Sequence, residues 1–331
     1  MSKNNNLHSA KKAKNDEFYT RITDVEKELK YYKDFFKGKK VLCNCNDGKI
    51  DGVWSAFAQY FSMNFEHLGL KKLTCVSYNE DGHGKKYVYE GDKNGNRIAD
   101  DFEWEVSELD GHGDFSDEEG QQMMQECDVV VTNPPFSLFR DFVAQLVKYG
   151  KKFLIIGNNN AIGWNDIFPY IKNEKIWLGV NNNKTIEFAI PNHYKKWNRI
   201  ENDIKIAKVP AISWFTNVPY SKYNQPLDLY KKYNPKDYPH YDNFDAIEVK
   251  KVSEIPYDWD GLMGLPITMM NNFDHNQFEI VGLLCDNKAD NINTFNGTPT
   301  FTDEKHKKSK CAVLNGKRLF ARILIRKKVK F

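Results

Sequence analysis

The sequence predicts an α/β fold built on a doubly wound, mostly parallel sheet, followed by a second domain of mixed α+β structure. Short apolar runs that end in polar or Gly-rich turns alternate with amphipathic segments of helical length. Strands separated by helices pair in parallel and carry helices on both faces of the sheet. The chain has 331 residues, enough for two domains, and its 40% hydrophobic content is typical of a globular protein.

The first part of the chain supplies two of the predicted strands. Residues 23–36 should form a helix, since apolar residues recur at helical spacing behind a Thr23 cap. A strand at KKVLCNC, a polar turn and an amphipathic segment, VWSAFAQYFSMNFEHL, come next. The second strand, at 71–78, leads into a charged, Gly-rich stretch at 79–100 that we interpret as a hairpin or a long loop.

The third and fourth strands complete the predicted sheet. A short helix at DEEGQQMMQE precedes the strand DVVVT at 128–132. The helix SLFRDFVAQLVKYG, closed by Gly150, precedes the strand KKFLIIG. Two further strand-like segments, TIEFAI and VPAISWFTNV, bracket a polar loop as a hairpin would.

The chain changes character near residue 219, where Tyr, Pro, Asn and Asp become frequent. Scattered strands are expected beyond this point at LPITMM, FEIVGLLC and KRLFARILIRKK. We therefore place one domain at 1–218 and a second domain at 219–331.

The composition of the chain indicates its cellular compartment and limits the kinds of metal and macromolecule that it could bind. No apolar run approaches the length of a bilayer span and the N-terminus lacks an apolar signal region, which predicts a cytoplasmic protein. The six cysteines show no zinc-ligand spacing, so neither a structural metal nor a disulfide is expected. The formal net charge is only +3, so a nucleic-acid surface requires unevenly placed charge. The first 14 residues are either a basic arm or a solvated tail, with Lys3, Lys11, Lys12 and Lys14.

In doubly wound sheets, ligands bind at the carboxyl ends of the strands. The segments after Cys45, Tyr78 and Thr132 are therefore the candidate sites, and the third of these reads Asn-Pro-Pro-Phe. A dinucleotide fingerprint GxGxxG follows none of the predicted strands, which argues against a nicotinamide cofactor.

Residues 133–136 have a composition suited to holding an amino group. Two consecutive prolines make the turn stiff. The side-chain oxygen of Asn133 and the carbonyl of Pro134 can then accept both hydrogens of an NH₂ group, while Phe136 stacks on its planar ring. No strong base is required for this chemistry. The alternative is a Pro-rich strand exit without function.

The sequence also resembles a known family. NPPF resembles motif IV of amino-group methyltransferases that use S-adenosylmethionine, and AKNDEFYT at 13–20 resembles the motif placed ahead of the sheet in DNA adenine methylases. The later segments IPNHY, ISWFTN, GLPITMMNNFDHNQFEIVG and NGKRLFARILIRKK resemble those of EcoRI-type adenine-specific methylases. The resemblance spans nearly the whole chain. It implies a Rossmann-like methyltransferase domain at 1–218 and a DNA target-recognition domain at 219–331.

The resemblance also implies roles for individual residues. It assigns NPPF, residues Asn133, Pro134, Pro135 and Phe136, to the target adenine. The expected FxGxG after the first strand is replaced by NCNDGKIDG, so the individual contacts of that loop are in doubt. Asp114 and Phe115 could instead belong to an acidic surface loop. The implied cofactor contacts are Phe18, Tyr19, Thr20, Asn44, Cys45, Asn46, Asp47, Tyr78, Asp114 and Phe115.

DNA binding is expected to use aromatic and basic side chains. An adenine in duplex DNA must swing out of the stack before its amino group can react. Phe136 offers one stacking face, and Tyr194 or Trp197 could supply the second. Between 305 and 331 the chain has eleven basic residues and no acid, which predicts phosphate contact, although part of this run could be a solvated strand edge. The basic residues are Lys305, Lys307, Lys308, Lys310, Lys317, Arg318, Arg322, Arg326, Lys327, Lys328 and Lys330.

These features predict a site-specific DNA methyltransferase that transfers a methyl group from S-adenosylmethionine to N6 of an adenine in double-stranded DNA. We expect a monomer that acts in a restriction–modification system or as an orphan enzyme. Two other interpretations stay open. One is a methyltransferase that acts on RNA or on protein glutamine, and the other is a non-catalytic DNA-binding protein on a methylase scaffold.

Overall fold

The computed structural model describes residues 18–50, 52–220, 225–285 and 311–328. It divides into two compact units, the first within Met1–Asn159 and Leu178–Ser221 and the second within Asn160–Trp177 and Lys222–Phe331. Residues 160–177 thus belong with the second unit although they precede its main segment. The functional roles expected for 1–218 and 219–331 stay predictions, and the basic N-terminal residues 3–14 lie outside the described part.

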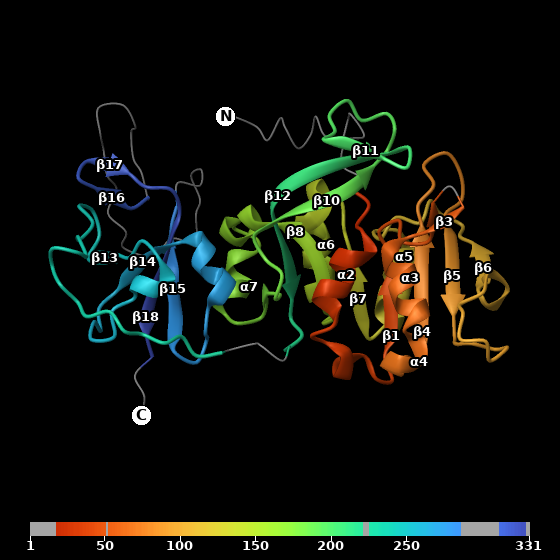
Figure 1. Ribbon diagram of the computed structural model, residues 1–331, viewed down its shortest axis with the longest axis horizontal. Helices are drawn as coiled ribbons and strands as arrows, with labels where there is room; N and C mark the ends of the chain where they lie inside the picture. Colours follow the sequence, from red (N-terminus) through yellow and green to blue (C-terminus); the bar gives the residue numbers. More distant parts are fainter. Residues whose placement is uncertain (1–17, 51, 221–224, 286–310, 329–331) are drawn as a thin grey trace. The chain divides into compact units, whose positions relative to one another are not determined.

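A large mixed sheet forms the first unit (Figure 1). Its strands are β1 (Lys40–Cys43), β4 (Lys72–Ser77), β5 (Lys85–Tyr89), β6 (Glu105–Glu108), β7 (Val129–Thr132), β8 (Lys152–Asn158), β9 (Trp177–Leu178), β10 (Lys184–Ile190), β11 (Arg199–Glu201) and β12 (Ile204–Thr216). The main order is β10-β12-β8-β7-β1-β4-β5-β6. The four central strands, β8, β7, β1 and β4, are parallel, which confirms the predicted parallel centre, and both edges are antiparallel.

Helices cover both faces of this sheet. They are α2 (Ile22–Leu29), α3 (Ala56–Met63), α4 (Phe65–Leu68), α5 (Glu118–Glu126) and α6 (Phe139–Lys148), with short 3₁₀ turns η1 (Lys33–Phe36), η2 (Asp101–Glu103), η3 (Phe136–Leu138) and η4 (Asn159–Gly163). Buried side chains of α2 and α3 pack with Val41, Cys43, Val129 and Val131 on one face. The intervening residues of the same strands point to the other face, toward α5 and α6, because side chains alternate along a strand.

Two local predictions need correction. The first helix begins at Ile22 behind Arg21, which provides no side-chain cap, so Thr23 lies inside the first turn and does not cap it. After β1, a small antiparallel pair precedes the helix, β2 (Lys49–Ile50) with β3 (Val53–Trp54). The hydroxyl of Ser55 then caps α3 by accepting a hydrogen bond from the Ala58 N–H at 3.1 Å.

Both predicted hairpins of the first unit form. The stretch at 79–100 contains β5, which pairs antiparallel with β4, and this supports the hairpin interpretation over a long loop. Strands β10 and β12 pair antiparallel, and β11 adds to β12 through a tight turn at Asn202 and Asp203, both with positive φ.

The second unit contains a four-stranded sheet of order β13-β14-β18-β15 and a separate pair, β16 with β17. LPITMM is a strand only as far as Pro266, because the chain then turns into a 3₁₀ helix, and KRLFARILIRKK is interrupted between Arg318 and Arg322. The elements are α7 (Phe168–Lys172), β13 (Ile247–Glu248), η5 (Val252–Glu254), β14 (Met263–Pro266), η6 (Ile267–Asn272), β15 (Phe278–Leu284), β16 (Val313–Leu314), β17 (Lys317–Arg318) and β18 (Arg322–Lys327).

Three further observations bear on the expectations from composition. In the described part of the chain, every helix is too short or too polar to span a bilayer. All six cysteines are in the reduced, thiol form. Among the described residues, no group of three or more His, Cys, Asp or Glu side chains is placed to hold a metal ion.

Candidate active site

A cavity of about 310 Å³ lies at the carboxyl ends of β1, β4 and β7 in the first unit. Its position is the one expected for a ligand site on an α/β sheet, and its volume is at the lower end of the range for small-molecule sites. The lining residues are Phe18, Tyr19, Asn44, Cys45, Asn46, Tyr78, Glu80, Gly113, Asp114, Phe115, Asn133, Pro134, Pro135, Phe136, Ser137 and Leu138.

The amide of Asn133 is held in one orientation. Its Nδ2 donates a hydrogen bond to the backbone carbonyl of Phe18 at 2.6 Å. Its Oδ1 is buried and has no hydrogen-bond partner within the described part of the chain. A buried acceptor without a partner is costly unless a ligand satisfies it. Asn133 therefore lines the cavity and carries a buried acceptor that has no partner among the described residues.

Aromatic rings form one wall beside this amide. Phe136 stacks on Phe18 with ring centroids 5.5 Å apart and an interplanar angle of 22°. Phe188 packs edge-on against both rings. One face of Phe136 is thus covered by Phe18, so stacking with a ligand would have to use the other face.

The residues that precede the first helix reach the cavity only in part. Phe18 and Tyr19 line it, whereas Thr20 does not. Tyr19 forms an isolated antiparallel bridge to Ala189 of β10, with hydrogen bonds of 2.8 and 3.0 Å. The predicted cofactor contact of Thr20 is therefore not supported by its position.

The loop after β1 contributes a second unpartnered polar atom. Asn44 is buried, and its Nδ2 has no hydrogen-bond partner among the described residues. Asn46 adopts a left-handed conformation with φ of 60°, and its Oδ1 accepts a hydrogen bond from the N–H of Tyr78 at 3.1 Å. Asparagine tolerates this conformation better than most residues. The loop thus joins the ends of β1 and β4 at the cavity although it lacks the expected glycines.

Asp47 is placed differently from the sequence prediction. It is buried and does not line the cavity. Its carboxylate accepts a hydrogen bond from the hydroxyl of Thr132, and its backbone N–H donates to Val76 at 2.8 Å. Burial raises its pKa to about 7, although the hydrogen bonds from Thr132 and from the backbone of Cys45 oppose the increase. Asp47 ties together the ends of three strands instead of contacting a ligand.

The loop that contains Asp114 and Phe115 forms part of the cavity wall. Asp114 Oδ1 accepts hydrogen bonds from the N–H and the hydroxyl of Ser116 at 2.8 and 2.7 Å. Phe115 is buried and meets Phe142 of α6 edge-on at 4.8 Å. Because both residues line the cavity and Phe115 is part of the core, this segment is more than an acidic surface loop.

Four lining residues were not predicted from the sequence: Glu80, Gly113, Ser137 and Leu138. Glu80 follows β4 by three residues. An acidic side chain near the end of the second strand is the usual partner of ribose hydroxyls in dinucleotide sites, and this spacing could have identified it. Gly113 has a φ of +82°, and a Cβ at this position would lie 2.8 Å from the Ser77 carbonyl oxygen. Tyr78, which was predicted, lines the cavity and is 39% exposed.

Neither of the two aromatic residues that could stack on the extruded base lines the cavity. Tyr194 is buried, packs edge-on against Phe18 at 6.1 Å and does not line the cavity. Its burial against Phe18 does not support the predicted stacking role opposite Phe136, which stays a prediction. Trp197 is 45% exposed, and the ammonium of Lys205 lies 4.1 Å from its ring centroid.

The basic run of the second unit has acidic partners from elsewhere in the chain. Four of its described side chains form ion pairs with acids that lie outside the run. Lys317 and Arg318 form β17, and the basic residues at 305–310 and 330 lie outside the described part. Phosphate contact by this run stays a prediction. The ion pairs are Arg322 with Glu248, Arg326 with Glu279, Lys327 with Asp260, and Lys328 with Glu174.

Comparison with known proteins identifies relatives along almost the whole chain. The family model described as adenine-specific methyltransferase EcoRI matches residues 6–328. Type II methyltransferase M.MgeORF184P of Mycoplasma genitalium is 39% identical over 329 residues, covering 97% of this chain and 98% of the relative. Type II methyltransferase M.EcoRI of Escherichia coli is 42% identical over 292 residues, covering 83% and 88%. Type II methyltransferase M.MpnI of Mycoplasma pneumoniae is 38% identical over 332 residues, covering 97% and 98%. No solved structure gives a significant match.

Proposed function

This chain belongs to the EcoRI family of adenine-specific methyltransferases, and from that membership we propose that it methylates N6 of an adenine in double-stranded DNA. The methyl donor is S-adenosylmethionine. The observation that carries the proposal is the free Oδ1 of Asn133 at the cavity. The type II names of the relatives support a role in a restriction–modification system, and a monomeric, cytoplasmic enzyme stays a prediction.

The cavity offers matching groups for the cofactor. The unpartnered donor of Asn44 and the carboxylates of Glu80 and Asp114 suit a ligand that carries a ribose and an adenine ring. Phe115 supplies an apolar surface for the ring, and Phe18 with Tyr19 closes the side next to NPPF. S-adenosylmethionine supplies a methyl group on a sulfonium, from which an amino nitrogen can displace the sulfur.

The chain contributes positioning and hydrogen bonding to this reaction. Asn133 Oδ1 and the Pro134 carbonyl accept the two amino hydrogens of the target adenine, which favours the orientation in which its nitrogen lone pair faces the methyl group. The two prolines fix these acceptors relative to β7. Phe136 stacks on the extruded base with the face that Phe18 leaves uncovered. The oxygens that accept the amino hydrogens also stabilise the positive charge that develops on nitrogen.

We also propose a DNA contact surface on the hairpin of β11 and β12. Lys205 and Ile200 are paired across this hairpin, so their side chains share one face, and the Trp197 ring lies against Lys205. Ile200 is 58% exposed. Lys195 and Lys196 are exposed and form no ion pair within the described residues. A basic face with exposed apolar groups suits a phosphate backbone beside an opened base pair.

Among the described residues with a buried, unpartnered side-chain polar atom, Asn44 and Asn133 are those that line the cavity, and this favours an enzyme over a non-catalytic DNA-binding protein. A buried donor on Asn44 and a buried acceptor on Asn133 cost free energy in the absence of a ligand. A protein that only bound DNA would gain nothing from keeping an unpartnered donor and an unpartnered acceptor on residues that line a cavity.

The function is tested by incubating plasmid DNA with the protein and S-adenosylmethionine, followed by single-molecule sequencing of modified bases. We expect N6-methyladenine within one short recognition sequence. Cofactor binding is measured separately by isothermal titration calorimetry. Methylation of RNA or protein without DNA modification, or binding of DNA without binding of S-adenosylmethionine, would contradict the proposal.

A further inference from the structure

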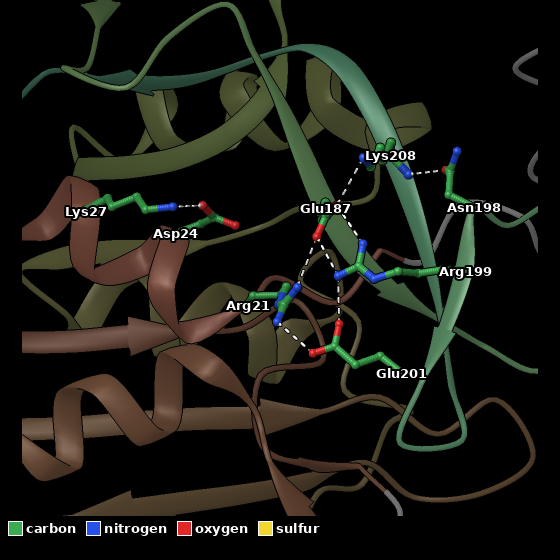
Figure 2. A network of polar contacts seen from close by, with 8 residues as sticks. All are labelled: Arg21, Asp24, Lys27, Glu187, Asn198, Arg199, Glu201 and Lys208. Atoms are coloured by element: carbon green, nitrogen blue, oxygen red, sulfur yellow. Dashed lines mark hydrogen bonds and ion pairs between the residues drawn. The ribbon is translucent and has the colours of Figure 1, made fainter.

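The segment at 18–21 is fixed to the main sheet by a network of charged side chains (Figure 2). Arg21 lies between two carboxylates, at 3.1 Å from Glu187 of β10 and 3.3 Å from Glu201 of β11. Arg199 makes two hydrogen bonds to Glu187, at 2.6 and 2.8 Å, and one to Glu201 at 2.7 Å. Lys208 approaches Glu187 at 3.5 Å. The network therefore links the segment to two strands that come much later in the sequence.

A second attachment lies two residues away. Tyr19 exchanges both backbone hydrogen bonds with Ala189 of β10. Together with the Arg21 contacts, this bridge fixes the course of the backbone on both sides of Thr20. Phe18 comes directly before the bridge, and its carbonyl accepts the hydrogen bond from Asn133 Nδ2.

The Phe18 carbonyl selects one of two orientations of the Asn133 amide. An amide side chain can rotate so that its oxygen and nitrogen exchange places. With a carbonyl on one side, only the NH₂ group can face that side without repulsion, and the oxygen must face away from it. In the reversed orientation an NH₂ group would meet the amino group of the substrate, and no acceptor would be offered.

We propose that Arg21 is a positioning residue, which through residues 18–21 holds the Phe18 carbonyl where it orients the Asn133 amide. The consequence for catalysis rests on the proposed function, whereas the orientation itself does not. Arg21 touches neither the cavity nor NPPF, so it acts only through the backbone between them.

The network can hold residues 18–21 in place without contributing much to the stability of the whole fold. Its side chains are 27% to 52% exposed, and ion pairs with this exposure contribute little to global stability. Glu187 has a pKa lowered to about 2, chiefly by the hydrogen bonds from Arg199, so it stays charged at any pH at which the protein is assayed. Removing Arg21 should therefore loosen the segment without unfolding the protein.

The chain provides a matched control for this substitution. Lys27 pairs with Asp24 at 3.1 Å on helix α2, close to Arg21 but outside the network (Figure 2). Arg21→Ala and Lys27→Ala each remove one cation from the same exposed region. Only the first removes a contact to β10 and β11.

The first measurement uses the free protein. With ¹⁵N-asparagine labelling, the side-chain NH₂ signal of Asn133 is identified by its absence in Asn133→Asp. We expect slow hydrogen exchange of this signal in the wild type and in Lys27→Ala, and faster exchange in Arg21→Ala. Equal exchange in all three proteins would overturn the proposal, whatever reaction the protein catalyses.

The second measurement uses tritiated S-adenosylmethionine and phage DNA. Arg21→Ala should lower kcat about ten-fold, because a misplaced catalytic group reduces rate even when the change is remote. Lys27→Ala should leave kcat unchanged. In an Asn133→Asp background the side chain has no donor for the Phe18 carbonyl to orient, so Arg21→Ala should cost less. An equal loss in both backgrounds, or an equal loss in Lys27→Ala, would overturn the proposal, and inactivity of the wild type would refute the proposed function alone.

Discussion

At the scale of single residues, the site depends on side chains whose polar atoms are held in one orientation. Asn133 and Asn44 both line the cavity, and each uses one atom of the amide within the protein and leaves the other without a partner among the described residues. The sequence predicted the importance of both residues, because each follows a buried strand. It could not predict their orientation, which depends on the Phe18 carbonyl and on the Cys45 thiol.

Asp47 makes a testable contribution to the pH dependence of stability. Its pKa is about 7 in the folded protein and 3.8 ordinarily, so the folded state retains a proton that the unfolded state has lost. The stabilisation is complete below pH 3.8 and is lost as pH rises to about 7. Across this window Asp47 should lower the free energy of unfolding by up to about 1.4 kcal/mol per pH unit.

Urea denaturation of the wild type and of Asp47→Asn at several pH values measures this effect. The amide can still accept the Thr132 hydroxyl hydrogen but does not ionise. Between pH 4 and 7 the free energy of unfolding should decrease less for the variant than for the wild type, because the variant has no group at this position that ionises in this range. Parallel curves for the two proteins would show that Asp47 is not the group responsible.

At the scale of elements, apolar strands were predicted well and connections were not. β1, β4, β7 and β8 are short buried runs bounded by polar turns, which is the pattern that identifies them. The pair β2 with β3 has two residues per strand, too few for any periodicity to appear. The strand LPITMM ends at Pro266, which no apolar count could indicate. The acidic partners of the basic strand β18 come from distant segments, which only the fold brings together.

The loop after β1 should be sensitive to close packing at Gly48. A Cβ at this position would meet the Ser77 hydroxyl and would lie 2.5 Å from the Tyr87 ring. Gly48→Ala should therefore destabilise the protein by about 1–3 kcal/mol and weaken cofactor binding, because the loop shifts. At Gly163 the nearest atom to such a Cβ is 3.6 Å away. Denaturation curves in which Gly48→Ala and Gly163→Ala are equally stable would contradict this packing.

At the scale of the whole molecule, the family and the α/β class could be predicted from the sequence, because motif order and strand alternation both run along it. The division into units could be predicted less well. Residues 160–177 belong with the second unit by contact, although a strand of the first unit precedes them and another follows them. The partners of charged side chains could not be predicted from the sequence either, since four residues of the basic run form ion pairs with acids from distant segments.

DNA affinity should accordingly depend on Lys195 and Lys196. Log-log plots of affinity against salt have a slope of about 0.9 per neutralised phosphate. The double variant Lys195→Glu with Lys196→Glu should reduce the magnitude of this slope by the amount that corresponds to about two phosphate contacts. The control pair is Lys37→Glu with Lys71→Glu. Both residues are exposed, and they lie before the amino ends of β1 and β4. Identical slopes for both double variants would remove the hairpin from the interface.

The most direct test of the whole account is the single-turnover rate of methyl transfer by Asn133→Ala, measured with saturating S-adenosylmethionine and duplex DNA. We predict that the rate falls at least about 10²-fold, since one preorganised hydrogen-bonding group is lost where charge develops. Cofactor and DNA affinities should persist. A variant that transfers the methyl group at nearly the wild-type rate would contradict the assignment of the Asn133 oxygen to the amino group of adenine.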